Sequence, residues 1–317
     1  MTVNIAYFCN IAYAKVMSNS LNWPLEATCS SEANQRWVQP ASNICLDFHG
    51  DPITAGLVVF SDGNHHMALE ASLQQFRQQH PEVIDIFYAT TPPSVIVSLL
   101  ITGTLVLGNL TLSRLPNVFI SPIGIMDRLQ ADGYVASHQV FMQSRGNVML
   151  VRKGNPKNIQ TIADLLREEV RLFISNPVTE KASYEVYEQT LLGLAEEENI
   201  SQDAMKELLA GSSDRLILGE RIHHREAPQC LFGDRADVAV IYYHLALRYT
   251  RIFPEHFEIV PLGDLKGDPE YSENNITTGY HIGLVGDGGE WGKPFLDYMF
   301  SDAVTQLYAE HGLQRPK

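Results

Sequence analysis

From Leu57 onward, short apolar runs alternate with segments of helical periodicity, and this alternation limits the folds open to the chain. Residues 57–60 are all apolar, and Leu69, Leu73 and Phe76 follow them at helical spacing. The run predicts a buried strand and the spacing predicts a helix. Because the alternation continues along the chain, it predicts an α/β fold built on parallel sheets.

The same patterns extend the expected elements to the end of the sequence. Further strands are expected near residues 83–88, 117–120, 148–151, 171–174, 237–241, 257–261 and 280–285. Helices are expected near residues 95–101 and 126–132, after the capping residues 161–164, and over 295–312. A long helix should bury one face, formed by Tyr184, Tyr187, Leu191 and Leu194. The closing helix should bury one stripe, formed by Leu296, Met299, Phe300, Val304 and Leu307.

The charge balance narrows the function classes. The 317 residues include 23 Lys and Arg against 37 Asp and Glu, a formal net charge of −14. An acidic chain lacks the basic surface that nucleic acids require, so we expect no nucleic-acid partner. A small anion site built from neutral donors is compatible with this charge. No apolar run reaches the roughly 18 residues of a spanning helix, so none is expected.

The first 55 residues show no sustained periodicity, and we expect an irregular N-terminal extension there. Residues 1–14 are mostly apolar and end in Ala-Tyr-Ala, but they lack a basic leading segment and make a poor signal peptide. Cys9, Cys29 and Cys45 lie in this extension, far from Cys230. If the protein is exported, a disulfide between two of the first three cysteines is an open alternative.

Small polar residues gather where the predicted strands end, which is where parallel sheets bind ligands. The segments are 61–66, 90–94, 175–183 and 242–244, together with 223–228, which is expected to precede a short helix. Hydroxyls and N–H groups at helix N-termini can hold an anion without bulk positive charge. Each segment also has a purely structural interpretation, as helix caps or packing aromatics.

The histidine pairs leave a second interpretation open. His65, His66, His223, His224 and Glu226 carry metal-ligating groups. Adjacent histidines point apart on a strand or helix, so a metal centre would need the two loops to meet. The motifs of α/β-hydrolases, zinc proteases and P-loop nucleotide-binding enzymes are absent from the sequence, and we expect no enzymatic activity.

Several segments together resemble the type II periplasmic solute-binding proteins of ABC importers, especially the molybdate- and tungstate-binding branch. Residues 151–156 (Val-Arg-Lys-Gly-Asn-Pro) are similar to that family's strand and turn. Residues 171–177 (Arg-Leu-Phe-Ile-Ser-Asn-Pro), followed by Thr179 and Ala182, are similar to its next strand and helix. Residues 233–242 resemble a third strand, and residues 295–312 resemble the closing helix.

The resemblance implies an α/β, two-lobed type II periplasmic-binding fold with a ligand cleft between the lobes. One lobe would contain residues 56–143 and 257–317, and the other residues 144–256. Carried over by position, the ligand contacts would be Asn64, Thr90 and Thr91 in the first two loops and Ala182 and Ser183 at a helix N-terminus. His223, His224, Arg225 and Tyr242 would complete the set.

Departures from the family pattern keep the ligand open. Asn64 stands where a serine is usual, and the second loop reads Thr-Thr-Pro-Pro. The segment His223-His-Arg-Glu-Ala-Pro resembles a related subgroup rather than the molybdate proteins. Arg225 can pair with an oxyanion, whereas the histidines and Glu226 can bind a divalent cation.

These observations favour a monomeric, extracytoplasmic or periplasmic substrate-binding protein. It would use no cofactor, bind a molybdate- or tungstate-like oxyanion and deliver it to an ABC membrane permease. The alternatives are a divalent metal-binding protein or metal-dependent enzyme using the histidine pairs, and a cytoplasmic ligand sensor on the same fold.

Overall fold

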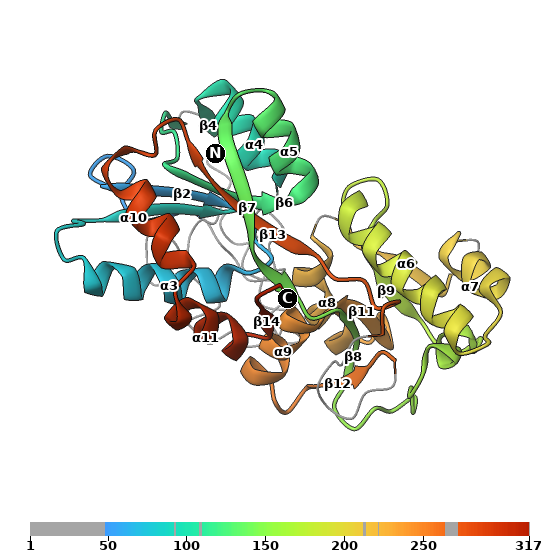
Figure 1. Ribbon diagram of the computed structural model, residues 1–317. Helices are drawn as coiled ribbons and strands as arrows, with labels where there is room; N and C mark the ends of the chain where they lie inside the picture. The colour runs from blue at the N-terminus through green and yellow to red at the C-terminus, as the bar shows by residue number, and fades with distance from the viewer. Residues whose placement is uncertain are drawn as a thin grey trace, which may run out of the picture. The chain divides into compact units, whose positions relative to one another are not determined.

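The computed structural model of the protein describes residues 48–91, 93–107, 110–211, 214–220, 222–263 and 272–316 (Figure 1). The chain divides into two compact units, each built on one sheet. The described residues of the five-strand unit fall within Val148–Ile241 and Tyr249–Asp268. Those of the seven-strand unit fall within Ile44–Asn147, Tyr242–Arg248 and Pro269–Lys317. Each unit therefore consists of segments that are discontinuous in sequence.

The seven-strand unit is a mixed sheet with helices on both faces. Its strand order is β1 (Phe48–His49), β3 (Ile86–Thr90), β2 (Leu57–Ser61), β6 (Val118–Pro122), β13 (Gly279–Val285), β7 (Val135–Ser144) and β14 (Leu313–Gln314). Strands β2, β3 and β6 run parallel, whereas β13 is antiparallel to both of its neighbours. The sheet is thus not the purely parallel one that the alternation predicted.

Two apolar cores cover the two faces of this sheet. One contains residues of α3 (His66–Gln79), α10 (Gly289–Met299) and α11 (Asp302–Glu310). The other contains residues of α4 (Pro93–Thr102) and α5 (Ile123–Ala131). Figure 1 shows these two groups of helices on opposite sides of the strands. A separate hairpin pairs β4 (Leu105–Leu107) with β5 (Leu110–Leu112).

The five-strand unit also has a mixed sheet. Its order is β10 (Leu216–Leu218), β9 (Leu172–Ile174), β11 (Val238–Tyr242), β8 (Asn147–Arg152) and β12 (Phe257–Pro261). Strands β9, β10 and β11 are parallel, and β12 is antiparallel to β8. The helical segments are η2 (Ile162–Leu166), α6 (Lys181–Glu197), α7 (Gln202–Leu209) and α8 (His223–Phe232). Helix α9 (Tyr243–Ile252) has residues in both units.

Most predicted elements form close to the expected positions, and the differences have local causes. The expected helix after Thr161 is a single 3-10 turn, stabilised by a capping box between Thr161 and Asp164. The strand expected at 83–88 forms at 86–90 instead. Within the expected irregular extension, Phe48 and His49 pair with β3. Residues 1–47, with the disulfide prediction for Cys9, Cys29 and Cys45, lie outside the described residues.

The prediction of one closing helix over 295–312 is wrong. The side chain of Ser301 accepts a hydrogen bond from the N–H of Val304 and starts a second helix, so the segment forms α10 and α11. The break rotates the buried stripe, and Phe300 is 36% exposed instead of buried. The buried residues of this region are Phe295, Tyr298, Met299, Val304 and Tyr308.

Two further sequence expectations concern membrane spans and Cys230. Across the ranges that the structure describes, no helix is long and apolar enough to cross a membrane. Cys230 is a buried free cysteine. Burial raises the pKa of its thiol to about 11, so the side chain stays protonated and unreactive at neutral pH.

Candidate functional site

In the seven-strand unit, two candidate loops meet at one edge of the sheet. Strands β2 and β3 are parallel, and Ser61 pairs with Thr90 at their carboxyl ends. The loop after β2 carries the half-buried Asn64, whose N–H donates to Asp62 Oδ1 at 3.0 Å. The loop after β3 begins with the buried Thr91. The structure therefore brings Asn64, Thr90 and Thr91 to the same edge, as parallel strand pairing dictates.

A glycine allows these two loops to approach closely. A Cβ atom added at Gly63 would lie 2.9 Å from the carbonyl oxygen of Thr90. Real side-chain carbons do not tolerate that distance to a backbone oxygen, so any other residue would push the loops apart. Gly63 thus fixes the spacing between the Asn64 loop and the threonine loop.

A buried hydrogen-bond chain fixes the loop that follows β2. His65 Nδ1 lies 2.9 Å from the hydroxyl of Tyr308, and its Nε2 lies 3.0 Å from Ser61 Oγ. Ser61 Oγ donates to the carbonyl of Asp62. The consistent assignment has Tyr308 donating to His65, which donates to Ser61. Burial, followed by the neighbouring His244, lowers the pKa of His65 to about 3 and keeps the ring neutral.

The residues at the start of α9 pack beside this chain. Tyr242 stacks on His244 with ring centroids 5.4 Å apart, and its hydroxyl lies 3.1 Å from Thr278 Oγ1. His244 is completely buried, and burial lowers its pKa to about 3 although the nearby carbonyl of Asn64 acts in the opposite direction. Tyr242 is therefore placed by a stacked neighbour and a hydroxyl partner.

Asp62 is a buried carboxyl group in the same loop. One oxygen accepts from the N–H of Asn64, while Oδ2 has no hydrogen-bond partner among the described residues. Burial raises the pKa of Asp62 to about 7, so the group is partly protonated near neutral pH. In its protonated form it is a hydrogen-bond donor next to Asn64.

The five-strand unit presents a second polar edge. Strands β9, β10 and β11 are parallel, and the helices α6, α8 and α9 follow their carboxyl ends. Ala182 and Ser183 lie in the first turn of α6, where backbone N–H groups lack intrahelical acceptors. Ala182 is exposed and Ser183 is partly exposed, so this turn is open to a ligand.

The segment 223–228 was expected to precede a short helix. It forms the first part of α8 instead. Pro228 lies inside this helix. His223 is buried in the core of its unit, with its ring stacked on Phe173 at 4.8 Å. Its ring is therefore not open to a ligand, whereas His224 and Arg225 are partly exposed.

Two carboxylates already occupy the N-terminus of α8. Glu180 Oε2 accepts from the N–H of His223 at 2.8 Å. The carboxylate of Glu226 accepts from the N–H of Glu220 at 2.8 Å and of Ile222 at 3.3 Å. Burial raises the pKa of Glu180 to about 7, and the neighbouring Glu226 acts in the same direction. Sequence reasoning missed Glu180, although an acidic residue just before α6 was visible in the sequence.

The metal interpretation of the histidine pairs finds little support within either unit. Both ring nitrogens of His65 are engaged, and His66 Nδ1 lies 2.8 Å from the carbonyl of Gly63. His66 also contacts Arg248. His223 and Glu226 belong to the other unit. Where the structure is described, no group of three or more His, Cys, Asp or Glu side chains is arranged to hold a metal ion.

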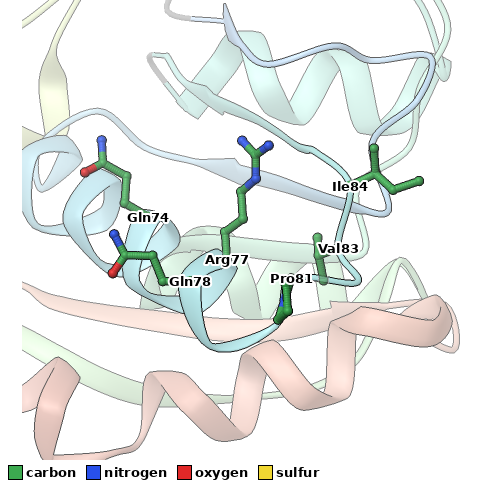
Figure 2. Close-up of a pocket in the computed structure, with 6 residues that line it drawn as sticks. All are labelled: Gln74, Arg77, Gln78, Pro81, Val83 and Ile84. Carbon is green, nitrogen blue, oxygen red and sulfur yellow. The ribbon is translucent and has the colours of Figure 1, made fainter.

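A surface pocket lies away from these loops, at the end of α3. Figure 2 shows its lining, formed by Gln74, Arg77, Gln78, Pro81, Val83 and Ile84. The pocket has a volume of about 500 Å³ and is open to solvent. None of its residues was predicted as a ligand contact, and Arg77 is paired with Asp85 at 3.7 Å.

Two α/β units with polar loops at the carboxyl ends of parallel strands are the architecture of the periplasmic solute-binding proteins. The chain belongs to the bacterial extracellular solute-binding proteins, whose family model matches residues 57–314. No curated protein matches the sequence.

Solved structures show the same fold at low sequence identity. The periplasmic molybdate-binding protein of Azotobacter vinelandii is 14% identical with a TM-score of 0.59, covering 82% of this chain and 100% of that one. The sulfate-binding protein SubI from Mycobacterium tuberculosis H37Rv is 15% identical with a TM-score of 0.60, covering 82% and 86%. The substrate-binding protein of an Agrobacterium tumefaciens ABC transporter is 14% identical with a TM-score of 0.59, covering 84% and 82%.

These comparisons confirm the α/β, two-lobed solute-binding fold and the expectation of a non-enzymatic protein. Proteins of this family are bacterial, extracellular and bind a solute. The enzyme alternative is therefore wrong.

Proposed function

We propose that the protein is the periplasmic substrate-binding component of an ABC importer for a small oxyanion, with molybdate and tungstate as the leading ligands. The observation that carries this proposal is the junction of the Asn64 loop with the Thr90–Thr91 loop at the ends of β2 and β3. It places an amide and hydroxyl-bearing residues side by side, with Gly63 setting their spacing.

Neutral donors of this kind suit an oxyanion in an acidic protein. Hydroxyls, side-chain amides and helix N-terminal N–H groups direct partial positive charge at a bound anion. In the five-strand unit, the open first turn of α6 supplies Ala182 and Ser183. The His223 N–H is engaged by Glu180, so the N-terminus of α8 supplies the backbone of His224, with Arg225 as a bidentate partner. Tyr242 adds a hydroxyl at the end of β11.

The relatives support an oxyanion without fixing which one. The similar structures include proteins described as binding molybdate and sulfate. Molybdate and tungstate differ from sulfate mainly in size, so the spacing of the loops decides between them. We propose that the protein acts as a monomer, since one chain supplies every donor named above.

The carboxylate of Glu180 is the main obstacle to an anion at the N-terminus of α8. A dianion next to an ionised Glu180 is disfavoured by like-charge repulsion. With a pKa of about 7, however, Glu180 can take up a proton and become a donor. The proposal therefore includes proton uptake by Glu180 when the oxyanion binds.

Calorimetric titration of the full chain with molybdate, tungstate and sulfate tests this function. We expect saturable binding of one equivalent of molybdate or tungstate, tighter than that of sulfate. A thermal unfolding shift should accompany it, because a ligand that binds only the folded state stabilises that state. The absence of binding and of a shift with all three anions would overturn the oxyanion assignment.

A further inference from the structure

A pair of histidines faces each other on two neighbouring strands of the seven-strand unit, away from every residue assigned above. His138 lies on β7 and His281 on the antiparallel β13. His281 pairs with Val140 and His138 pairs with Gly283, so the histidines are diagonal neighbours on one face of the sheet. Their Nδ1 atoms are 2.9 Å apart.

The missing side chain of Gly283 makes room for this arrangement. A Cβ atom at Gly283 would lie 3.3 Å from the Cβ of His138 and 2.6 Å from a methyl carbon of Val135. Any larger residue would therefore displace the His138 side chain or its strand. The diagonal contact between the two imidazoles depends on this glycine.

A carboxylate fixes the orientation of the first imidazole. Asp127 Oδ1, from helix α5, lies 3.1 Å from His138 Nε2. The carboxylate favours the tautomer with a proton on Nε2, which leaves the Nδ1 lone pair of His138 facing His281. The contact between the rings is then a hydrogen bond from His281 Nδ1 to His138 Nδ1.

We propose that His138 and His281 form a binding site for one divalent transition-metal ion of the Cu²⁺ or Ni²⁺ type, with Asp127 as the positioning residue. A carboxylate on the outer nitrogen of a ligating histidine is the usual support of such sites. An ion about 2.1 Å from each Nδ1 would bind both at nearly a right angle. That angle suits the tetragonal geometry of Cu²⁺ and Ni²⁺ better than tetrahedral zinc.

Binding requires no net loss of protons from the neutral pair. The proton on His281 Nδ1 moves to its Nε2 through solvent, and the ion takes the two Nδ1 lone pairs. Burial, followed by His138, lowers the pKa of His281, so its imidazole is neutral at pH 7 and free to ligate. Among the described residues no third metal-ligating side chain joins the pair, so water completes the coordination.

This site does not depend on the proposed oxyanion function. It uses none of the oxyanion contacts, and its residues lie on the middle of β7 and β13 and on α5 instead of at the carboxyl ends of β2 and β3. Metal and oxyanion titrations on the same protein therefore give separate answers.

Titration of the full-length chain with Cu²⁺, followed by electron paramagnetic resonance, tests the proposal. We expect one equivalent of bound Cu²⁺ whose spectrum shows superhyperfine coupling to two imidazole nitrogens. His138→Gln and His281→Gln should each weaken this binding at least tenfold and remove the two-nitrogen pattern. Asp127→Asn should weaken it roughly tenfold while keeping the pattern, because it only positions His138.

His80→Gln is the matched control. His80 also lies beside a carboxylate, with its Nδ1 3.5 Å from Glu82 Oε1, but it faces no second histidine. This variant should bind Cu²⁺ as the wild type does. The proposal is overturned if the wild type takes up no Cu²⁺, or if uptake persists unchanged in both His138→Gln and His281→Gln. Thermal unfolding of each variant establishes that it is folded.

Discussion

Oxygen Oε2 of Glu180 accepts a hydrogen bond of 2.8 Å from the backbone N–H of His223. An intrinsic anion thus occupies the N-terminus of α8, where the first N–H groups of a helix attract negative charge. Glu226 accepts from the N–H groups of Glu220 and Ile222 nearby. These two carboxylates therefore already place negative charge at the N-terminus of α8 when no ligand is bound.

Replacing Glu180 with glutamine should strengthen oxyanion binding. The amide oxygen of Glu180→Gln can still accept from the His223 N–H, but the charge that repels the ligand is gone. We expect about a tenfold gain in affinity for molybdate at pH 8 and little change at pH 5.5, where wild-type Glu180 is protonated. Calorimetric titration at both pH values measures this. Glu185→Gln, on the exposed face of α6, serves as the control that removes a charge elsewhere.

The same substitution should change how stability depends on pH. The pKa of Glu180 is raised from 4.5 to about 7 in the folded protein, so the folded state holds this proton more tightly than the unfolded state. The stability that protonated Glu180 contributes to the folded state is therefore fully present below pH 4.5 and is lost as the pH rises through 7. Glu180→Gln should gain stability relative to wild type over that window, by on the order of 2 kcal/mol at pH 8. Urea unfolding at pH 5 and pH 8 measures it, and an equal difference at the two pH values contradicts the assignment.

The threonine loop offers a direct test of the ligand contacts in the other unit. Thr91→Val keeps the shape of the side chain but removes its hydroxyl, and we expect about a tenfold loss of oxyanion affinity, equivalent to one hydrogen bond. Thr111→Val removes the hydroxyl of an exposed residue on β5 and should leave affinity unchanged. Equal affinities for the two variants would remove Thr91 from the site.

The spacing set by Gly63 should be intolerant of even one methyl group. Gly63→Ala places a Cβ 2.9 Å from the Thr90 carbonyl oxygen, and we expect a cost of about 1–3 kcal/mol together with weaker oxyanion binding. A Cβ atom added at Gly124 on α5 would meet no atom within 4 Å. The Gly124→Ala variant should therefore be as stable as the wild type or more stable by about 0.5 kcal/mol. Urea unfolding compares the two variants, and a neutral Gly63→Ala would show that the loops are not closely packed there.

The buried chain through His65 should make Tyr308→Phe costly. Loss of the hydroxyl leaves His65 Nδ1 without its hydrogen bond in a fully buried site, which costs about 1–3 kcal/mol. Tyr298→Phe loses a hydroxyl that donates to Gln75 Oε1 nearer the surface, and we expect about 1 kcal/mol or less. Denaturant midpoints of the two variants give the comparison, and equal midpoints would argue against the chain.

Local signals in the sequence located most strands and helices but not the contacts between distant segments. Buried runs such as 57–60 and the apolar face of α6 are determined by nearby residues, and they form where expected. The contact between His65 and Tyr308 joins residues 243 positions apart, and no local pattern encodes it. The segment 223–228 was expected to precede a short helix, yet α8 begins at His223 and continues through Pro228, although proline usually ends a helix. The carboxylate at the His223 N–H was not predicted either, since Glu180 lies just before α6, 43 positions earlier in the sequence.

Strand β13 lies between β6 and β7, in the middle of the seven-strand sheet, although it is formed by residues 279–285. During synthesis, β2, β3, β6 and β7 emerge long before the strand that joins β6 to β7. A nascent chain therefore has two exposed sheet edges where the finished protein has a continuous sheet. This unit can complete its folding only after nearly the whole chain has left the ribosome, and a truncation before residue 279 should leave it unable to fold.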